Sequence, residues 1–188
     1  MKKTIIFGSV LAVLLVAGTV VYQKLGEEVT PSIVEEEVIQ DESVEARPAP
    51  DFNMLKFEGG VVNLEDVIGE KPVVLNFWAS TCPPCVYEMP TFQQSFEKHE
   101  DVQFVMVNIL GFNGETQQSA RQFIDENNYT MPVFHEANGE ASKAYGLTSI
   151  PRTLFINKKG EIIFEQNGMM EEKVLTEGIT ALLNEGSD

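Results

Sequence analysis

The chain has 188 residues, of which 43% are hydrophobic, and this suits one globular domain with additional segments. Its formal net charge at pH 7 is -16. Without a basic patch to displace counterions from phosphates, the chain is not expected to bind nucleic acid.

The chain begins with a long uncharged stretch, Thr4–Tyr22, which follows Lys2 and Lys3. A helix needs about 20 apolar residues to span a bilayer, and the flanking lysines would stay in the cytoplasm. Residues 1–24 are therefore predicted to be a transmembrane signal-anchor, and the protein a single-pass protein of the cell membrane. A cleaved signal peptide is the alternative, with a weak cleavage site near Ala17. Both interpretations place the C-terminal domain outside the cytoplasm, where disulfides persist.

Residues 25–50 have the composition of a linker. They contain three prolines, no aromatic residue and eight acidic residues against a single arginine. Such a segment cannot bury enough apolar surface to fold alone, and its like charges extend it. We therefore expect an acidic, disordered tether between the anchor and a domain that spans residues 51–188.

The domain alternates between strand and helix patterns. Turn signals at Glu58-Gly59-Gly60 and Lys158-Lys159-Gly160 predict a β-hairpin near each end. The order predicts an α/β domain with a mixed sheet flanked by helices. The predicted elements are strands 52–57 and 61–64, a helical turn at 64–68, strand 72–78, helix 83–99, strand 102–109, helix 116–127, strand 131–134, helix 140–145, strands 152–157 and 161–165, and helix 171–183.

The two cysteines of the chain, Cys82 and Cys85, follow the apolar strand pattern at Val73–Trp78 in C-x-x-C spacing. The free N–H groups and positive dipole end of the following helix favour a thiolate at Cys82. Pro83 and Pro84 suit a first helical turn and stiffen the loop between the sulfurs. We expect Cys82 to attack the disulfide of a partner protein and Cys85 to resolve the mixed disulfide. The reverse sequence would oxidise the partner.

Two other roles of a cysteine pair are a static disulfide and part of a zinc site. A static disulfide gains little from closing so small a loop. A closed zinc site needs four ligands, and the two histidines of the chain, His99 and His135, are both expected at the surface. Neither a metal nor another cofactor is therefore expected besides the redox-active cysteine pair.

The stretch N-F-W-A-S-T-C-P-P-C, with Ser149-Ile150-Pro151 downstream and an N-terminal anchor, resembles the TlpA/ResA-like thiol-disulfide oxidoreductases of the thioredoxin superfamily. The resemblance covers roughly residues 51–183. It implies a thioredoxin-like mixed sheet with an N-terminal β-hairpin and an extra βα insertion within residues 102–134.

The resemblance also implies roles for individual residues. Cys82 would be the exposed nucleophile and Cys85 its buried partner. Pro151 would be a cis-proline that faces the dithiol and exposes the backbone of Ile150 for pairing with a bound partner chain. Glu88 matches an acidic position near the active site, where a buried carboxylate would raise thiol pKa values and could pass protons.

Trp78 matches the aromatic residue that the family places before the active-site turn. The family usually has Trp immediately before the first cysteine, whereas Thr81 stands here, which changes the contacts with partners. The dipeptide Pro83-Pro84 is one of several that the family uses. Together with Ile150, these residues are the expected substrate contacts.

The resulting hypothesis is a membrane-anchored, extracytoplasmic thiol-disulfide oxidoreductase that reduces the disulfides of partner proteins. The resemblance suggests clients in cytochrome c maturation or oxidative-stress repair, and a reductase requires an electron donor in the membrane. The alternatives are an oxidase that forms disulfides and a non-catalytic binding module with a thioredoxin fold. A peroxidase is less favoured, because the peroxidatic pattern has Thr three residues before the cysteine and Ala79 stands there.

Overall fold

The computed structural model describes residues 46–136 and 138–185. The predicted anchor and most of the predicted linker lie outside the described residues. Within the described ranges, no helix combines the length and the apolar character that crossing a membrane requires.

The strands and longer helices predicted for residues 51–188 are present, and their ends lie within two residues of the predicted ones. The predicted helical turn at 64–68 is a hydrogen-bonded turn and not a helix. Two elements were not predicted: the short strand β1 and a single 3-10 turn, η1. In chain order the elements are β1 (Arg47–Pro48), β2 (Asn53–Lys56), β3 (Val61–Asn63), β4 (Val73–Trp78), α2 (Pro83–Lys98), β5 (Gln103–Asn108), η1 (Phe112–Gly114), α3 (Gln117–Asn127), β6 (Val133–Glu136), α4 (Glu140–Ala144), β7 (Arg152–Ile156), β8 (Glu161–Asn167) and α5 (Glu172–Asn184).

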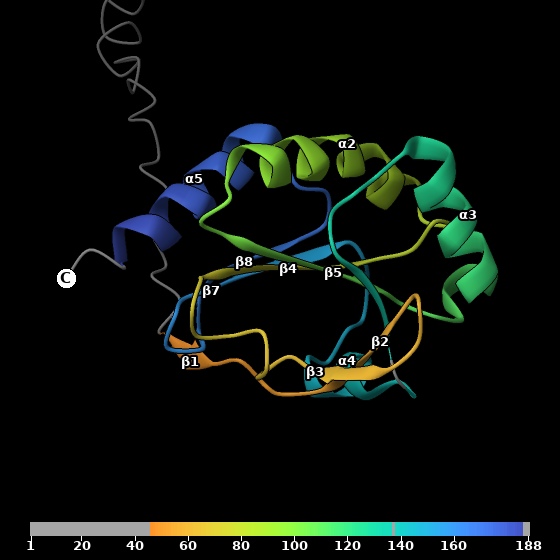
Figure 1. Cartoon of the computed structure of the whole chain (residues 1–188), viewed down its shortest axis with the longest axis horizontal. Helices are drawn as coiled ribbons and strands as arrows, with labels where there is room; N and C mark the ends of the chain where they lie inside the picture. The colour runs from red at the N-terminus through yellow and green to blue at the C-terminus, as the bar shows by residue number, and fades with distance from the viewer. Residues whose placement is uncertain (1–45, 137, 186–188) are drawn as a thin grey trace, which may run out of the picture. The chain divides into compact units, whose positions relative to one another are not determined.

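The strands form one sheet in the order β1-β8-β7-β4-β5-β6-β2-β3 (Figure 1). Strand β4 lies in its middle, parallel to β5 and antiparallel to β7. Strand β5 is in turn parallel to β6, and the two hairpins extend the sheet at both edges. The predicted mixed sheet is thus confirmed, and the segment expected to hold the extra βα unit contains β5, α3 and the first two residues of β6.

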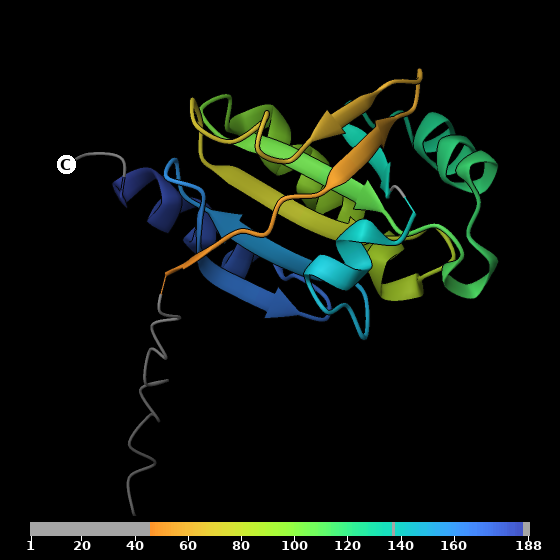
Figure 2. The ribbon, with the colours of Figure 1, turned by 90° about the horizontal axis from the view of Figure 1, so that it is seen from below.

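Alternating side chains of the central strands supply two apolar cores, because successive side chains point to opposite faces of a sheet. On one face, Val74 and Trp78 of β4 pack beneath α2, α3 and α5. On the other face, Val73, Leu75 and Phe77 pack against α4 and the N-terminal segment that carries β2 and β3 (Figures 1 and 2). Among the described residues, this second face therefore has one short helix, and hairpin and loop residues complete its cover.

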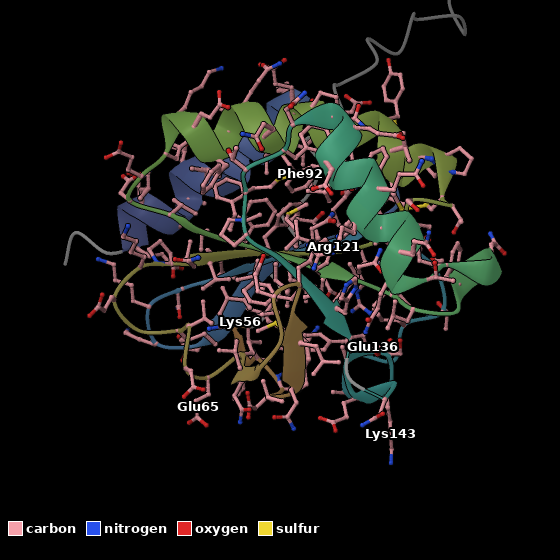
Figure 3. All side chains as sticks on the ribbon, turned by 45° about the vertical axis from the view of Figure 1, so that its right-hand side comes forward. Lys56, Glu65, Phe92, Arg121, Glu136 and Lys143 are labelled. Atoms are coloured by element: carbon pink, nitrogen blue, oxygen red, sulfur yellow. A yellow bond between two sulfur atoms is a disulfide. The ribbon has the colours of Figure 1, made fainter. Side chains whose placement is uncertain are left out.

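Helix packing on the first face is close. Figure 3 shows Phe92 of α2 in the layer between the helix and the sheet, where it is completely buried, whereas Lys143 of α4 points away from the domain. On α5, Gly178 permits the closest approach to the sheet: a Cβ atom at this position would lie 2.3 Å from Cε1 of Phe155. The absence of a side chain at Gly178 therefore sets the distance between α5 and β7.

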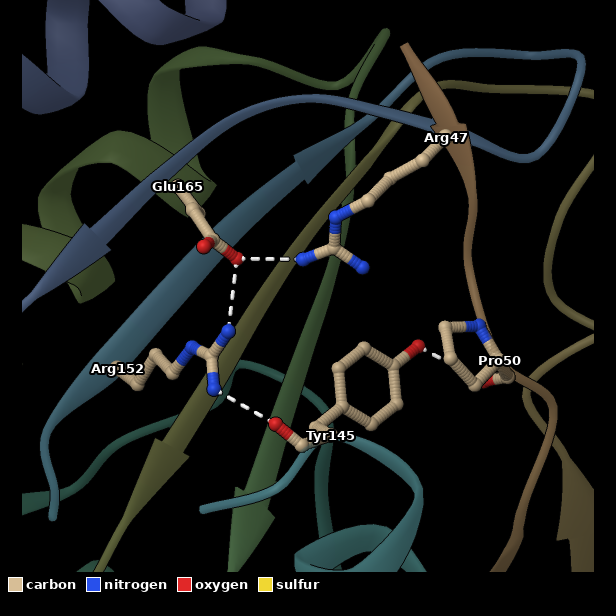
Figure 4. A network of polar contacts seen from close by, with 5 residues as sticks. All are labelled: Arg47, Pro50, Tyr145, Arg152 and Glu165. Carbon is tan, nitrogen blue, oxygen red and sulfur yellow. Dashed lines mark hydrogen bonds and ion pairs between the residues drawn. The ribbon is translucent and has the colours of Figure 1, made fainter. Parts of the chain in front are cut away.

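The ordered domain begins earlier than residue 51, so the predicted end of the linker is wrong. Strand β1, within the predicted linker, pairs antiparallel with β8. The guanidinium of Arg47 donates to Glu165 at 2.8 Å, and the hydroxyl of Tyr145 donates to the carbonyl of Pro50 at 2.8 Å (Figure 4). Arg152 joins this network through bonds of 2.8 Å to Glu165 and to the carbonyl of Tyr145. The composition of the linker could not reveal these partners, which lie about a hundred residues away in the sequence.

Candidate active site

The cysteine pair lies where the central strand meets the first long helix. Cys82 is the N-cap residue of α2, its backbone is extended, and its side chain makes no capping hydrogen bond. Pro83 and Pro84 occupy the first helical positions, and the first turn carries no acidic residue. The sulfurs of Cys82 and Cys85 form a disulfide with a Cα–Cα distance of 5.3 Å, which is common for disulfides. The predicted strand, turn and helix therefore bring the two thiols together without displacement of the backbone.

Both cysteines are buried in this disulfide form. Cys82 is 3% exposed and Cys85 is completely buried, so the expectation that Cys82 is exposed is wrong for this state. The reason is local packing: Cys82 belongs to the apolar core of the helical face, and its Sγ atom lies 3.7 Å from the carbonyl oxygen of Ile150. Pro83 and Pro84 are exposed beside it.

The loop before β7 faces the dithiol. The Ile150–Pro151 peptide bond is cis, the conformation that the resemblance implied. The carbonyl of Pro151 accepts a hydrogen bond of 2.9 Å from the backbone of Gly168, which attaches this loop to the end of β8. Beside Ile150 lies an open cavity of about 170 Å³. Its walls are Ile109, Phe112, Ser142, Leu147, Thr148, Ser149 and Ile150.

Glu88 is a buried carboxylate on α2, three residues after Cys85. It is 1% exposed and accepts hydrogen bonds from Nδ2 of Asn76 at 2.9 Å and from the backbone of Met170 at 2.6 Å. The same amide nitrogen of Asn76 donates to the hydroxyl of Thr153 on β7 at 3.0 Å. Burial raises the pKa of Glu88 to about 7, although the two hydrogen bonds lower it. The side chain can therefore bind or release a proton near neutral pH.

Trp78 does not contact solvent, which corrects the expectation that it touches a substrate directly. Its indole is completely buried, and its ring packs against Phe123 of α3 with 5.7 Å between centroids. Trp78 is the last residue of β4 and points to the helical face of the sheet. Its role in this structure is packing beneath the active-site turn, whereas the half-buried Thr81 remains available to a partner.

A second buried carboxylate, Glu115, was not anticipated from the sequence. It lies just before α3, is 3% exposed, and accepts hydrogen bonds from Ser80, Thr81 and Asn108. The signal that could have suggested it is the pair of hydroxyl residues before Cys82, because buried hydroxyl groups need hydrogen-bond partners. The sequence offers no indication of which distant acceptor would supply them.

His135 is also buried, although it was expected to be solvated. It is 3% exposed, stacks on Phe57 with 4.2 Å between ring centroids, and its Nδ1 lies 3.4 Å from Oδ1 of Asn108. Burial is the main cause that lowers its pKa to about 4, and the charge of Arg121 adds to it. His99 is only partly exposed at the end of α2. Among the described residues, no group of three or more His, Cys, Asp or Glu side chains could hold a metal ion.

Comparison with known proteins agrees with this geometry. Residues 46–165 match the profile of the AhpC/TSA family. The chain is 35% identical over 128 residues to sporulation thiol-disulfide oxidoreductase A of Bacillus subtilis (67% of this chain, 76% of that protein). It is 32% identical over 132 residues to thiol-disulfide oxidoreductase ResA of Bacillus thuringiensis (70% of this chain, 74% of that protein). The crystal structure of StoA from Bacillus subtilis superimposes with a TM-score of 0.60 at 34% identity and covers 70% of this chain and 97% of that one. The predicted thioredoxin-like α/β fold is thereby confirmed.

Proposed function

Because the chain belongs to the AhpC/TSA family and resembles named thiol-disulfide oxidoreductases, we propose that it works as a reductase of partner-protein disulfides outside the cytoplasm. The oxidoreductase activity follows from these relatives and from the Cys82–Cys85 pair. The direction of electron flow, the location and the partners are the parts that we propose. The observation that carries the proposal is a disulfide at a helix N-terminus, with a cis-proline loop on one side and a buried carboxylate along the same helix.

In the proposed reaction, the reduced protein supplies two electrons. The Cys82 thiolate attacks one sulfur of the partner's disulfide, the partner's S–S bond breaks, and the released partner thiolate takes up a proton. Cys85 then loses its proton and attacks the Cys82 sulfur. This step breaks the mixed disulfide, releases the second partner thiolate, which is protonated in turn, and forms the Cys82–Cys85 disulfide.

Glu88 is proposed to accept the proton that Cys85 loses. Its burial beneath the helix and its pKa of about 7 suit a group that receives a proton and passes it on at neutral pH. Its carboxylate is held by Asn76 and by the backbone of Met170. Its position is therefore set by two separate parts of the fold.

The partner is proposed to bind as an extended segment along the backbone of Ile150. The carbonyl oxygen of Ile150 lies 3.7 Å from the Cys82 sulfur, and the cavity of about 170 Å³ beside it can receive a small side chain next to the partner's cysteine. Pro83 and Pro84 are exposed and Thr81 is half-buried, and the three residues form the rim that the partner would contact.

The location is proposed to be the outer side of the cell membrane, with residues 1–24 as the anchor and residues 25–46 as the tether. Support comes from the uncharged stretch that follows Lys2 and Lys3. After each turnover, a donor in the membrane would reduce the Cys82–Cys85 disulfide again. Candidate clients are exported proteins whose cysteines must be reduced, as in cytochrome c maturation or oxidative-stress repair.

Insulin reduction by the full chain tests the activity. We expect Cys82→Ser to abolish it, whereas Thr180→Ala, an exposed change on α5, should leave it intact. A reduction potential of about -270 mV would support a reductase, whereas one of about -120 mV would establish an oxidase instead. Partners trapped as mixed disulfides on Cys85→Ser in cells would identify the clients. Protease treatment of intact cells would show whether the domain lies outside.

A further inference from the structure

The carboxylate of Glu115 is buried behind the active-site turn. The Ser80 hydroxyl donates within 2.8 Å of Oε2 and 2.9 Å of Oε1. The backbone N–H of Thr81 donates to Oε2 at 3.0 Å, and Nδ2 of Asn108 donates to Oε1 at 2.9 Å. Every one of these partners is a donor, which matches an ionised carboxylate that can only accept. Among the described residues, no Lys or Arg forms a salt bridge with Glu115.

The loop that carries Glu115 is itself held in place. The backbone of Gly111 donates to the carbonyl of Glu115 at 2.9 Å, and the backbone of Glu115 donates to the carbonyl of Phe112 at 2.8 Å. Gly111 has a positive φ of 83°, a conformation that glycine adopts without strain. The hydroxyl of Thr81 donates to the same Phe112 carbonyl at 2.9 Å. The two residues before Cys82 are therefore attached to this loop by both side chains and by one backbone group.

We propose that Glu115 is a positioning residue for Cys82: it fixes the Ser80-Thr81 backbone from which Cys82 enters α2, and it places a negative charge behind the nucleophile. This charge opposes the positive end of the α2 dipole and disfavours the Cys82 thiolate. The inference rests on the dithiol chemistry proposed above, but it does not depend on the direction of electron flow.

The geometry brings the charge close enough to act. Oε2 of Glu115 lies 3.0 Å from the Thr81 nitrogen, so covalent geometry places it within roughly 8.3 Å of the Cys82 Cα atom and, over the two further bonds to the sulfur, within roughly 11 Å of Sγ. At this range, in the partly polar environment of a buried loop, a unit charge shifts a thiol pKa by about one unit.

Other titratable or charged groups lie in the same region, and their effects on the Cys82 pKa must be distinguished from that of Glu115. Glu88 lies on α2, and burial raises its pKa to about 7. His135 on β6 reaches Glu115 through Asn108, and its pKa is lowered to about 4, so it is neutral at pH 7. Arg121 of α3 donates to the carbonyl of Phe57 and lies over the Phe57 ring.

The test is a pH titration of Cys82 in the full chain with Cys85→Ser, where Cys82 is the sole thiol, and the ultraviolet absorbance of the thiolate measures its ionisation. We expect Glu115→Gln to lower the Cys82 pKa by about one unit, which is a roughly tenfold rise in the thiolate-to-thiol ratio below the pKa. The same shift should appear in a Glu88→Gln background, since Glu115 acts independently of Glu88. The matched control is Glu140→Gln, which alters a carboxylate that also accepts from a backbone N–H and an amide group, both of Asn53. It should leave the pKa of Cys82 unchanged.

A folded Glu115→Gln variant whose Cys82 titrates as in the parent would overturn the inference. If this variant does not fold, Ser80→Ala provides the second test through hydrogen exchange at the Thr81 amide. Loss of the Ser80 hydroxyl should accelerate that exchange roughly tenfold, and an unchanged rate would also overturn the inference. Failure of the wild-type chain to reduce insulin would refute the proposed function instead, because the thiol titration does not depend on turnover.

Discussion

Titration of Glu88 should make the folded protein less stable as the pH rises. Its pKa is about 7 in the folded protein, against an ordinary value of 4.5. Below pH 4.5 the carboxyl group is protonated in both states. Between pH 4.5 and 7 the unfolded chain releases this proton while the folded protein keeps it, so the folded state binds more protons and the free energy of unfolding falls. Above pH 7 the loss is complete.

The size of this effect follows from the difference of 2.5 between the two pKa values. Each unit corresponds to about 1.36 kcal/mol, so Glu88 should remove about 3 kcal/mol of stability between pH 4.5 and pH 7. This is a large part of the total stability of an ordinary domain, which is about 5–15 kcal/mol.

Glu88→Gln isolates this contribution, because Gln carries no charge at any of these pH values. Asn76 and the Met170 backbone both donate to Glu88 in the wild type, and the amide NH₂ of Gln cannot accept from the donor that it faces. This adds a destabilisation of about 1–3 kcal/mol that does not depend on pH. Urea unfolding of both proteins in the disulfide form, from pH 4.5 to pH 8.5, measures the difference without titration of the thiols. The stability of the wild type relative to the variant should fall by about 3 kcal/mol across this range. A difference that stays constant with pH, or that grows in favour of the wild type, would refute the reasoning.

Two further predictions concern packing and the N-terminal segment. Gly178→Ala should destabilise the domain by about 1–3 kcal/mol in urea unfolding, because the new Cβ would lie 2.3 Å from the Phe155 ring; a neutral effect would mean that α5 shifts freely on β7. Tyr145→Phe should cost about 1 kcal/mol, because the hydrogen bond to the Pro50 carbonyl is lost. Tyr87→Phe is its control, since Tyr87 is 76% exposed, and equal effects of the two substitutions would contradict this role of the bond.

The secondary structure was predictable because local patterns determine it. Strand β4 is apolar except for Asn76 and is covered on both faces, and glycines close the hairpin turns. The N-terminus of α2 follows from Pro83 and Pro84, which suit the first helical positions. The position of the dithiol at that junction was therefore also predictable.

The environment of each side chain near the dithiol was harder to predict. Glu88, His135 and Trp78 are all fully or almost fully buried, but their neighbours in the sequence do not show which faces of the elements are covered. Glu115 is separated from Ser80 by 35 positions and comes from a glycine-rich loop. Its role depends on the conformation of that loop.

The sequence by itself determined the redox chemistry of this protein: two cysteines at a strand-to-helix junction, where local geometry and the helix dipole suffice to make a reactive pair. The tertiary structure alone decided the environment of that pair. It placed Cys82 against the Ile150 carbonyl, buried Glu88 so that its pKa rises to about 7, and attached the active-site turn to Glu115. The physical reason is that burial and hydrogen bonding depend on contacts between distant segments, whereas the strand, the turn and the helix depend on residues a few positions apart.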